Sequence, residues 1–164
     1  MSKITKIILL VLVIAILGFG VGWVWLEKNA AENTESASMI IKKFPQTENI
    51  SENLVVNELP NYNIGGRDYI GVIKIGQNEV AIKKTDIENG IIKSDTFKGG
   101  FMDAKNFSED ETIIFMTTNG KTYQYQISKI RHIKDLNNLA KDGNKIMLAI
   151  RDYLNFEWIV VEGI

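Results

Sequence analysis

The first part of the chain is one long apolar run, IILLVLVIAILGFGVGWVWL, which begins at Ile7 and ends at Leu26. In a helix, about 20 residues span roughly 30 Å, the thickness of the hydrocarbon core of a bilayer. Because the run contains no charged residue, it predicts a single transmembrane helix. The preceding residues 1–6 include Lys3 and Lys6, and lysine favours the cytoplasmic side of a membrane. We therefore expect a cytoplasmic N-terminus and an extracellular C-terminal domain.

A cleaved signal peptide is the competing interpretation of this run, because small residues follow it in the stretches NAA and SAS. The apolar region of a signal peptide has only about 7 to 15 residues. The greater length of this run favours an uncleaved anchor, at residues 7–26, in the cell membrane.

Residues 27–60 are mainly polar and predict a stalk between the membrane and a folded domain. Within this stalk, Met39, Ile40 and Phe44 fit one face of a helix that would end before Pro45. Such a helix would lie against the domain or continue the membrane helix outward. A flexible tether is an equally good interpretation of the same residues.

From residue 61 to residue 164 the pattern changes to short runs rich in β-branched and aromatic residues, which are typical of strands. Leucine spacing over residues 134–145 predicts one short helix. Many short strands with one or two small helices predict a mainly β fold, either a barrel or a sandwich. Besides the hairpin described next, the predicted strands are residues 69–75, 78–84, 90–93, 146–150 and 158–161.

The clearest unit is the stretch TIIFMTTNGKTYQYQISKI, residues 112–130, which predicts a β-hairpin. Asn119 and Gly120 tolerate the positive φ angles that a type I′ turn needs at both central positions. Counting outward from this turn gives the cross-strand pairs of the face that should form the core. The predicted pairs are Met116 with Tyr123, Ile114 with Tyr125, and Thr112 with Ile127.

Composition narrows the possible chemistry. The 164-residue chain has 19 Lys and Arg against 20 Asp and Glu, so it has no basic field that would attract nucleic acid by counterion release. It has no cysteine, which excludes disulfides, thiolate catalysis and cysteine-based zinc sites. Its one histidine, His132, excludes a multi-histidine metal site. We expect no metal, no cofactor and no nucleic acid partner.

The other motifs have structural interpretations. The pairs Gly65-Gly66 and Gly99-Gly100 lack the helix and the lysine that a phosphate loop requires, so each predicts a tight turn. His132 directly follows a strand and fits a solvent-facing or capping role better than a catalytic triad. A cluster of carboxylates lacks the spacing of an EF-hand and predicts a solvated turn. Its members are Asp103, Glu109, Asp110 and Glu111.

The order of these features resembles the sortase family. It combines one N-terminal span, a polar stalk, the strand YIGVIKI, the segment GGFMDAKNF, and the stretch DETIIFMTTNGKTYQYQISKI before a terminal strand pair. The hairpin part, NGKTYQYQISKI, is similar to a dGktYtYeV stretch of the family, and the resemblance covers residues 69–164. It implies a small closed β-barrel that is anchored in the membrane of a Gram-positive bacterium. Sortases cleave surface proteins at a sorting signal and join them to an acceptor.

The resemblance also places the three catalytic positions of the family, and none holds the expected residue. Arg151, in IMLAIR, replaces the cysteine that ends the penultimate strand. Glu157, in EWIVVEGI, replaces the arginine that opens the last strand, and the histidine position falls near Lys93 in GIIKSDTFKGGF. Lacking these three groups, the chain would be a pseudoenzyme. If the three substitutes converge, we expect an ion pair and contact with a peptide or carboxylate ligand.

Three functions remain open at this point. The leading hypothesis is a non-catalytic, sortase-like domain that binds or scaffolds a protein or peptide partner at the cell envelope. The alternative is a single-span structural subunit of a secretion, conjugation or division machine, which an open sheet or a helix packed across one face would favour. The last is a hydrolase that uses Asp152 and Glu157 as paired carboxylates. Ser94 and Thr96 are poor substitute nucleophiles, because no base lies near them in the sequence.

Overall fold

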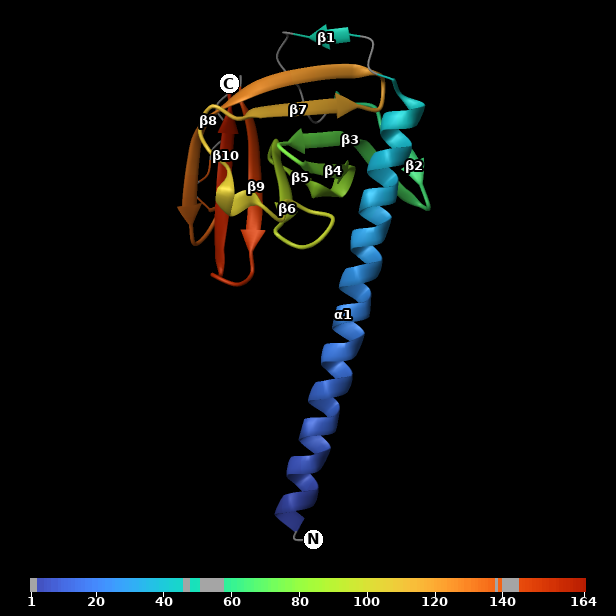
Figure 1. Cartoon of the computed structure of the whole chain (residues 1–164), viewed down its shortest axis with the longest axis vertical. Helices are drawn as coiled ribbons and strands as arrows, with labels where there is room; N and C mark the ends of the chain where they lie inside the picture. The colour runs from blue at the N-terminus through green and yellow to red at the C-terminus, as the bar shows by residue number, and fades with distance from the viewer. Residues whose placement is uncertain (1–2, 46–47, 51–57, 138, 140–144) are drawn as a thin grey trace.

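The computed structural model describes residues 3–45, 48–50, 58–137, 139 and 145–164. One long helix, α1 (Lys3–Lys43), leads into a mainly β domain (Figure 1). Among the described residues, the short 3₁₀ helices η2 (Lys84–Asp86) and η3 (Ala104–Asn106) interrupt the strands. The strands are β1 (Glu48–Ile50), β2 (Tyr62–Ile64), β3 (Arg67–Ile75), β4 (Asn78–Lys83), β5 (Ile87–Glu88), β6 (Ile91–Asp95), β7 (Thr112–Thr117), β8 (Lys121–Ile133), β9 (Ile146–Asp152) and β10 (Glu157–Gly163).

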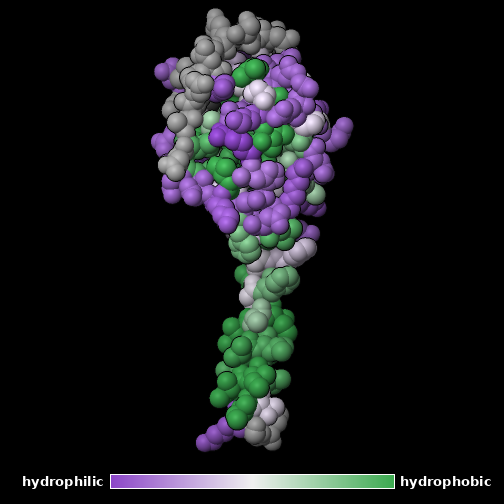
Figure 2. Space-filling view, turned by 90° about the vertical axis from the view of Figure 1, so that its left-hand side faces the viewer, coloured by the Kyte–Doolittle hydropathy of each residue, from purple (hydrophilic) through white to green (hydrophobic). Residues whose placement is uncertain are grey.

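The N-terminal part of α1 is apolar and stands clear of the domain. Figure 2 shows this part as a hydrophobic rod below a mostly hydrophilic head. Within the described part of the chain, α1 is long and apolar enough to cross a membrane, and its most apolar 18-residue window is not buried. The helix ends at Lys43, two residues before Pro45, because proline cannot continue the hydrogen-bonding pattern of a helix. This agrees with the end predicted from the sequence.

The C-terminal part of α1 packs against the outer face of β3 and β4. Ala37 and Ile40 are buried there, at 2% and 0% exposure, in one cluster with Tyr69, Val72 and Ala81. The sequence left open a flexible tether or a helix for this segment, and the structure shows a helix. It continues the apolar helix outward and also lies against the domain. Met39 was predicted on the same face but is 43% exposed. It precedes Ile40 directly, and consecutive helical residues point about 100° apart.

A second contact joins α1 to the domain closer to the apolar run. The loop after β6 brings Gly99 against Ala30, and the Asn33 side-chain amide donates a 2.6 Å hydrogen bond to the Gly99 carbonyl. Gly99 has φ +86, and a Cβ atom placed on it would lie 2.8 Å from the Ala30 Cα atom. Only glycine fits this approach. The Gly99-Gly100 pair is therefore a tight turn, as predicted, that also seats the domain on the helix.

The strands form one curled sheet in the order β2-β3-β7-β8-β10-β9-β6-β5, with β4 paired to β3 and β1 to β8. Two of the pairings, β6 with β9 and β1 with β8, are parallel. The curl brings the two ends of the sheet near each other. β4, which pairs with β3 at one end, continues through η2 into β5, the edge strand at the other end. The prediction of a mainly β fold after one apolar helix is confirmed, and the barrel expected from the resemblance is a curled half-barrel.

Apolar side chains fill the inside of the curl. Representative members are Ile73, Phe115, Ile127, Leu148 and Val161, none more than 1% exposed. They come from β3, β7, β8, β9 and β10, and the alternation of side chains along each strand directs them to one face. A smaller cluster on the outer side of β9 and β10 packs against Leu136 and Leu139. The short helix predicted over 134–145 falls mainly on residues 138 and 140–144, outside the described residues.

The β7–β8 hairpin is present, but its predicted register is wrong by one residue. Met116 pairs with Thr122 rather than with Tyr123, and only Gly120 of the turn has a positive φ, +81. The Thr117 hydroxyl accepts a hydrogen bond from the Lys121 N–H, and the Thr117 carbonyl accepts one from the Gly120 N–H. These bonds stabilise a loop of three residues rather than a two-residue type I′ turn.

The shift reverses the inward face of β7, because one residue of slip moves every side chain to the opposite face. On β8 the structure keeps two predicted core residues, Tyr123 and Ile127, at 8% and 1% exposure. Tyr125 also keeps its predicted side, half-buried against the core. The remaining predicted partners lie outside this core, at intermediate or full exposure: Met116, Ile114 and Thr112. The buried residues of β7 are instead Ile113, Phe115 and Thr117.

We predict that replacing Ile40 by alanine lowers the free energy of unfolding of the β domain by about 2–5 kcal/mol, because it leaves a cavity between α1 and the sheet. The matched control is Met39→Ala, on the adjacent exposed position of the same helix. The measurement is pulse proteolysis of the full chain in detergent micelles over a urea series. Equal stability of the two variants would show that α1 does not stabilise the domain.

Candidate functional site

The structure does not bring Lys93, Arg151 and Glu157 into one ion pair. Arg151 in β9 lies opposite Trp158 of β10, whereas Glu157 lies opposite Asp152. Directly opposed residues share a face, and consecutive residues alternate between faces. Arg151 and Glu157 therefore project from opposite faces of the sheet. The convergence that was the condition for an ion pair among the three residues is therefore not met.

Each of the three side chains has its own partner. Lys93 forms an ion pair with Glu88, which belongs to the neighbouring strand β5. Glu157 lies 2.8 Å from Nδ1 of His132, so the histidine has a carboxylate partner beside the end of β10. The Arg151 guanidinium lies 5.2 Å from the centre of the Trp158 ring, a cation–π arrangement. Whether any of the three contacts a ligand stays a prediction.

Asp95, which the sequence did not single out, is the neighbour of Arg151 in the sheet. It ends β6 and pairs with Arg151 through the parallel ladder to β9. Its Oδ1 accepts a 2.9 Å hydrogen bond from the Phe97 N–H, and its carbonyl accepts a 2.8 Å bond from the Phe101 N–H. These bonds fold the loop that carries Gly99. In the sequence, Asp95 is a single aspartate at the end of a strand, and this pattern is too common to indicate a functional residue.

A cavity of about 320 Å³ lies between α1, β4, β6 and this loop. We call it the α1–sheet cavity. Its lining mixes cationic and anionic groups close to the end of the apolar run of α1. The apolar run contributes Trp25 and Leu26 to the wall. The charged lining residues are Arg67, Lys83, Lys93, Lys98, Asp86 and Asp95.

The charges of this cavity are only partly paired. Arg67 forms a 2.5 Å ion pair with Glu32 of α1, and Lys93 is paired with Glu88. In the part of the chain that the structure describes, Lys83 and Lys98 form no ion pair, although Lys83 lies near both Asp86 and Asp95. These two lysines leave positive charge available to an anionic ligand.

Burial raises the pKa of Asp86 and of Asp95 above the usual range of aspartate. The hydrogen bonds from the Lys83 and Phe97 N–H groups and the charge of Lys83 lower both values, but burial outweighs them. A raised pKa makes a carboxylate easier to protonate, and clefts with such groups are typical of functional sites. No local sequence pattern indicates this cavity, since its walls come from segments far apart in the chain.

The surroundings of Asp152 do not favour the paired-carboxylate hypothesis. Asp152 and Glu157 are opposite each other, but the Asp152 carboxylate is fully buried and accepts hydrogen bonds from Asn155, from the Leu154 N–H and from Lys105, which lies 2.9 Å away. Burial alone would raise the pKa of Asp152, but these bonds outweigh it and the pKa lies below the usual range. This bonding favours the ionised carboxylate and ties it to its neighbours, which suits a structural role better than that of a general acid.

Metal binding has no support among the residues whose positions are described. They contain no group of three or more His, Cys, Asp or Glu side chains that could hold an ion. Of the carboxylates considered for Ca²⁺, Asp110 instead accepts a 3.0 Å hydrogen bond from the Gln126 side chain. Glu111 accepts one from the Ser108 N–H at 3.4 Å. These contacts organise the loop before β7.

No protein-family model and no curated protein matches the sequence. Similar solved structures include sortase C1 from Streptococcus agalactiae, at 17% identity and a TM-score of 0.48, over 62% of this chain and 69% of that one. Sortase C from Streptococcus pneumoniae is 12% identical, with a TM-score of 0.48 and coverage of 84% and 92%. Sortase C from Clostridium perfringens SM101 is 14% identical, with a TM-score of 0.44 and coverage of 84% and 85%. The similarity concerns the path of the chain and assigns no role to any residue.

We predict that Asp152→Asn and Asp86→Asn change stability with opposite signs. A folded pKa below the unfolded value of about 3.9 stabilises the fold above that pH, and the contribution disappears as pH falls. Asp152→Asn should therefore lower the free energy of unfolding by roughly 1–3 kcal/mol at pH 7, with a smaller deficit below about pH 4. For Asp86 the folded pKa is raised, so the ionised carboxylate destabilises the fold at neutral pH.

Asp86→Asn should accordingly equal or exceed the stability of the unmodified chain at pH 7, and this advantage should shrink in acid. The measurement is urea unfolding of the full chain in micelles at neutral and acid pH. A deficit of Asp152→Asn that is the same at both pH values would contradict the ionised, hydrogen-bonded state of this carboxylate.

Proposed function

We propose that this chain is a membrane-anchored, non-catalytic binding or scaffolding protein of the Gram-positive cell envelope, with a cytoplasmic N-terminus and an outward-facing, sortase-like domain. The absence of cysteine from the sequence carries the proposal, because a sortase needs a cysteine thiolate to attack its substrate. Arg151 occupies the place that the resemblance gives to this cysteine and lies over Trp158. An arginine is permanently charged and is no nucleophile.

The α1–sheet cavity is the binding site that we propose for a partner. Lys83 and Lys98 offer charge to a carboxylate, while Asn33 and Ser94 line the same cavity and can exchange hydrogen bonds with a peptide backbone. The oxygen of the Asn33 side chain is buried and has no hydrogen-bond partner among the residues that the structure describes. A peptide segment with an acidic side chain or a free C-terminus fits this chemistry.

A structural subunit of a larger membrane machine is the second candidate. One observation favours it: α1 packs across the outer face of β3 and β4 instead of acting as a loose tether. A rigid joint of this kind holds the domain in one orientation to the membrane, as a fixed component of an assembly requires. The two candidates differ in whether the partner occupies the cavity.

The binding proposal predicts that a photo-reactive amino acid at Lys98, on the cavity wall, forms one discrete adduct in native membranes of the source cells. The matched control is the same residue at Lys74, a partly exposed β3 lysine that pairs with Glu79 outside the cavity. Gel mobility and mass spectrometry report the adduct. The control position should give none.

Two outcomes would contradict the proposal. Equal labelling from Lys98 and Lys74, or adducts from Lys74 alone, would show that the cavity is not the binding site and would favour the subunit. A covalent adduct that forms without illumination would show that the domain performs chemistry.

A further inference from the structure

The turn between β9 and β10 exposes three large apolar side chains. Tyr153, Leu154 and Phe156, which we call the β9–β10 tip, are 49%, 82% and 76% exposed. They dominate the exposed large hydrophobic residues that the structure describes outside α1. The full set is Met102, Tyr153, Leu154, Phe156 and Ile164. A cluster of this kind on an otherwise polar surface marks a contact with something outside the domain.

Contacts with neighbouring residues fix the conformation of the tip. The Asp152 carboxylate accepts hydrogen bonds from the Leu154 N–H at 3.1 Å and from the Asn155 side chain at 2.8 Å. Lys105 of η3 fixes the same carboxylate. The Tyr153 ring stacks on Phe97, with 5.0 Å between ring centres and 13° between planes. The turn is therefore built to present Leu154 and Phe156 outward.

Phe156 adopts a backbone conformation that does not suit its side chain. Its φ is +55, in the left-handed region where glycine and asparagine are favoured and a bulky residue is strained. An exposed phenylalanine gains little from packing inside the domain, which would offset this strain. The position is thus better explained by a contact that the ring makes outside the molecule.

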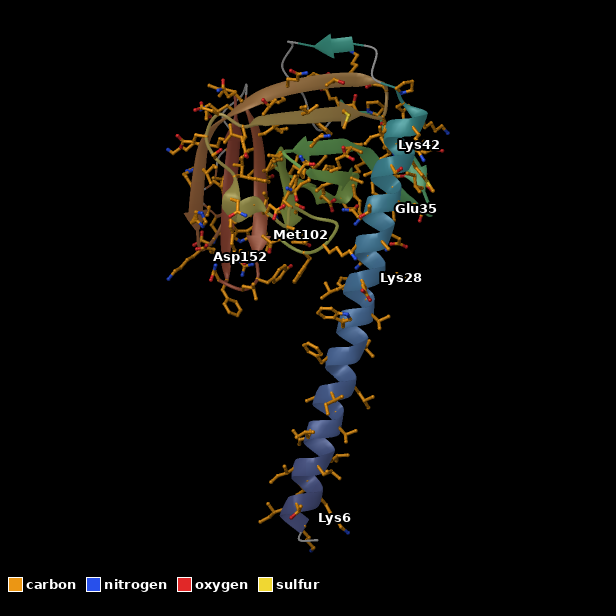
Figure 3. The ribbon with its side chains drawn as sticks, in the orientation of Figure 1. Lys6, Lys28, Glu35, Lys42, Met102 and Asp152 are labelled. Carbon is orange, nitrogen blue, oxygen red and sulfur yellow. The ribbon has the colours of Figure 1, made fainter. Side chains whose placement is uncertain are left out.

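The tip faces the membrane side of the molecule. Figure 1 shows that the β9–β10 turn points along α1 toward its N-terminal half, away from β1 at the opposite end of the domain. In Figure 3, Asp152, where β9 ends, lies slightly farther from the N-terminus than Lys28 does, and the turn extends from there toward the apolar part of α1. Trp23 and Trp25, at 58% and 63% exposure, end that apolar part.

We propose that the β9–β10 tip enters the interfacial region of the outer leaflet beside α1, as a second membrane contact of the chain. This inference rests on the proposed function, because it requires α1 to span the bilayer. Aromatic and leucine side chains favour the boundary between headgroups and acyl chains, where Trp23 and Trp25 would also lie. Lys28 and Lys98 line a common hollow next to the end of the apolar run, within reach of lipid headgroups.

The rigid joint between α1 and the domain makes this contact possible. Because Ile40 and Ala30 are buried against the domain, the tip cannot rotate freely about the helix. The second contact is then intramolecular, so even a weak affinity of the tip for lipid is effective. It would hold the α1–sheet cavity at a constant height above the membrane surface.

The absence of cysteine allows single labelling sites to be introduced for the test. Leu154→Cys, labelled with nitrobenzoxadiazole, is incorporated as the full chain into nanodiscs that contain lipids with a nitroxide near the headgroup. We expect a blue-shifted emission and loss of more than half of the intensity relative to nitroxide-free nanodiscs. A Gln124→Cys label, in the part of β8 that follows the β1 contact, should show neither change.

A third label separates this inference from the proposed anchor. Gly22→Cys lies in the apolar run and reports whether α1 is in the bilayer. If Gly22 is quenched and Leu154 behaves like Gln124, the anchor stands and the tip proposal is wrong; the tip is then a surface for a protein partner. If Gly22 is not quenched, the anchor itself is wrong and the inference falls with it.

Phe156→Gly distinguishes a membrane contact from a structural role of the ring. Glycine removes the strain of the left-handed conformation, so the domain should be at least as stable to urea as the unmodified chain. The quenching of the Leu154 label should nevertheless decrease by at least twofold, because the ring no longer holds the tip in the interface. A clear loss of stability with unchanged quenching would show that Phe156 serves the fold and not the membrane.

Discussion

Ala37 and Ile40 attach α1 to the outer face of β3 and β4, and Ala30 meets Gly99 nearer the apolar run. These two contacts lie along one helix, so together they remove both the tilt and the rotation of the domain relative to α1. The α1–sheet cavity exists because of this packing, since one of its walls is the helix. The direction of the β9–β10 tip follows from it as well. The apolar helix and the β domain therefore form one body, with the β9–β10 tip on the side of the apolar run.

The charged side chains fall into two regions. In one they are paired with neighbouring side chains, and in the other, two lysines are available to a ligand. Where β9 ends and β10 begins, Asp152 contacts Lys105 and Asn155, and Glu157 contacts His132, which suits a structural role. In the cavity, Lys83 and Lys98 form no ion pair with any side chain that the structure describes. Asp152 connects the paired carboxylates with the β9–β10 tip. Its hydrogen bonds favour the ionised carboxylate, and they also shape the tip that follows it.

Local sequence patterns predicted the features that local physics determines. The apolar run, the strand-rich second half and the position of the β7–β8 hairpin all depend on neighbouring residues, and all are present. The hairpin register depended on side-chain hydrogen bonds of Thr117, which a count from Asn119 and Gly120 does not include. The pairing of Asp95 with Arg151 requires a parallel ladder between strands far apart in sequence. The residues that pack against Ile40 are also far from it in the sequence. The sequence alone therefore did not distinguish a packed helix from a flexible tether in this segment.

The most direct test of this account is the distance between α1 and the sheet in a lipid bilayer. Nitroxide labels at Glu35→Cys in α1 and Gln124→Cys in β8, both exposed positions, can be placed on the cysteine-free chain and measured by pulsed electron paramagnetic resonance in nanodiscs. The account predicts one narrow distance distribution that is the same in micelles and in nanodiscs. A broad distribution, or one that changes between the two environments, would show that the domain moves independently of the helix and would contradict it.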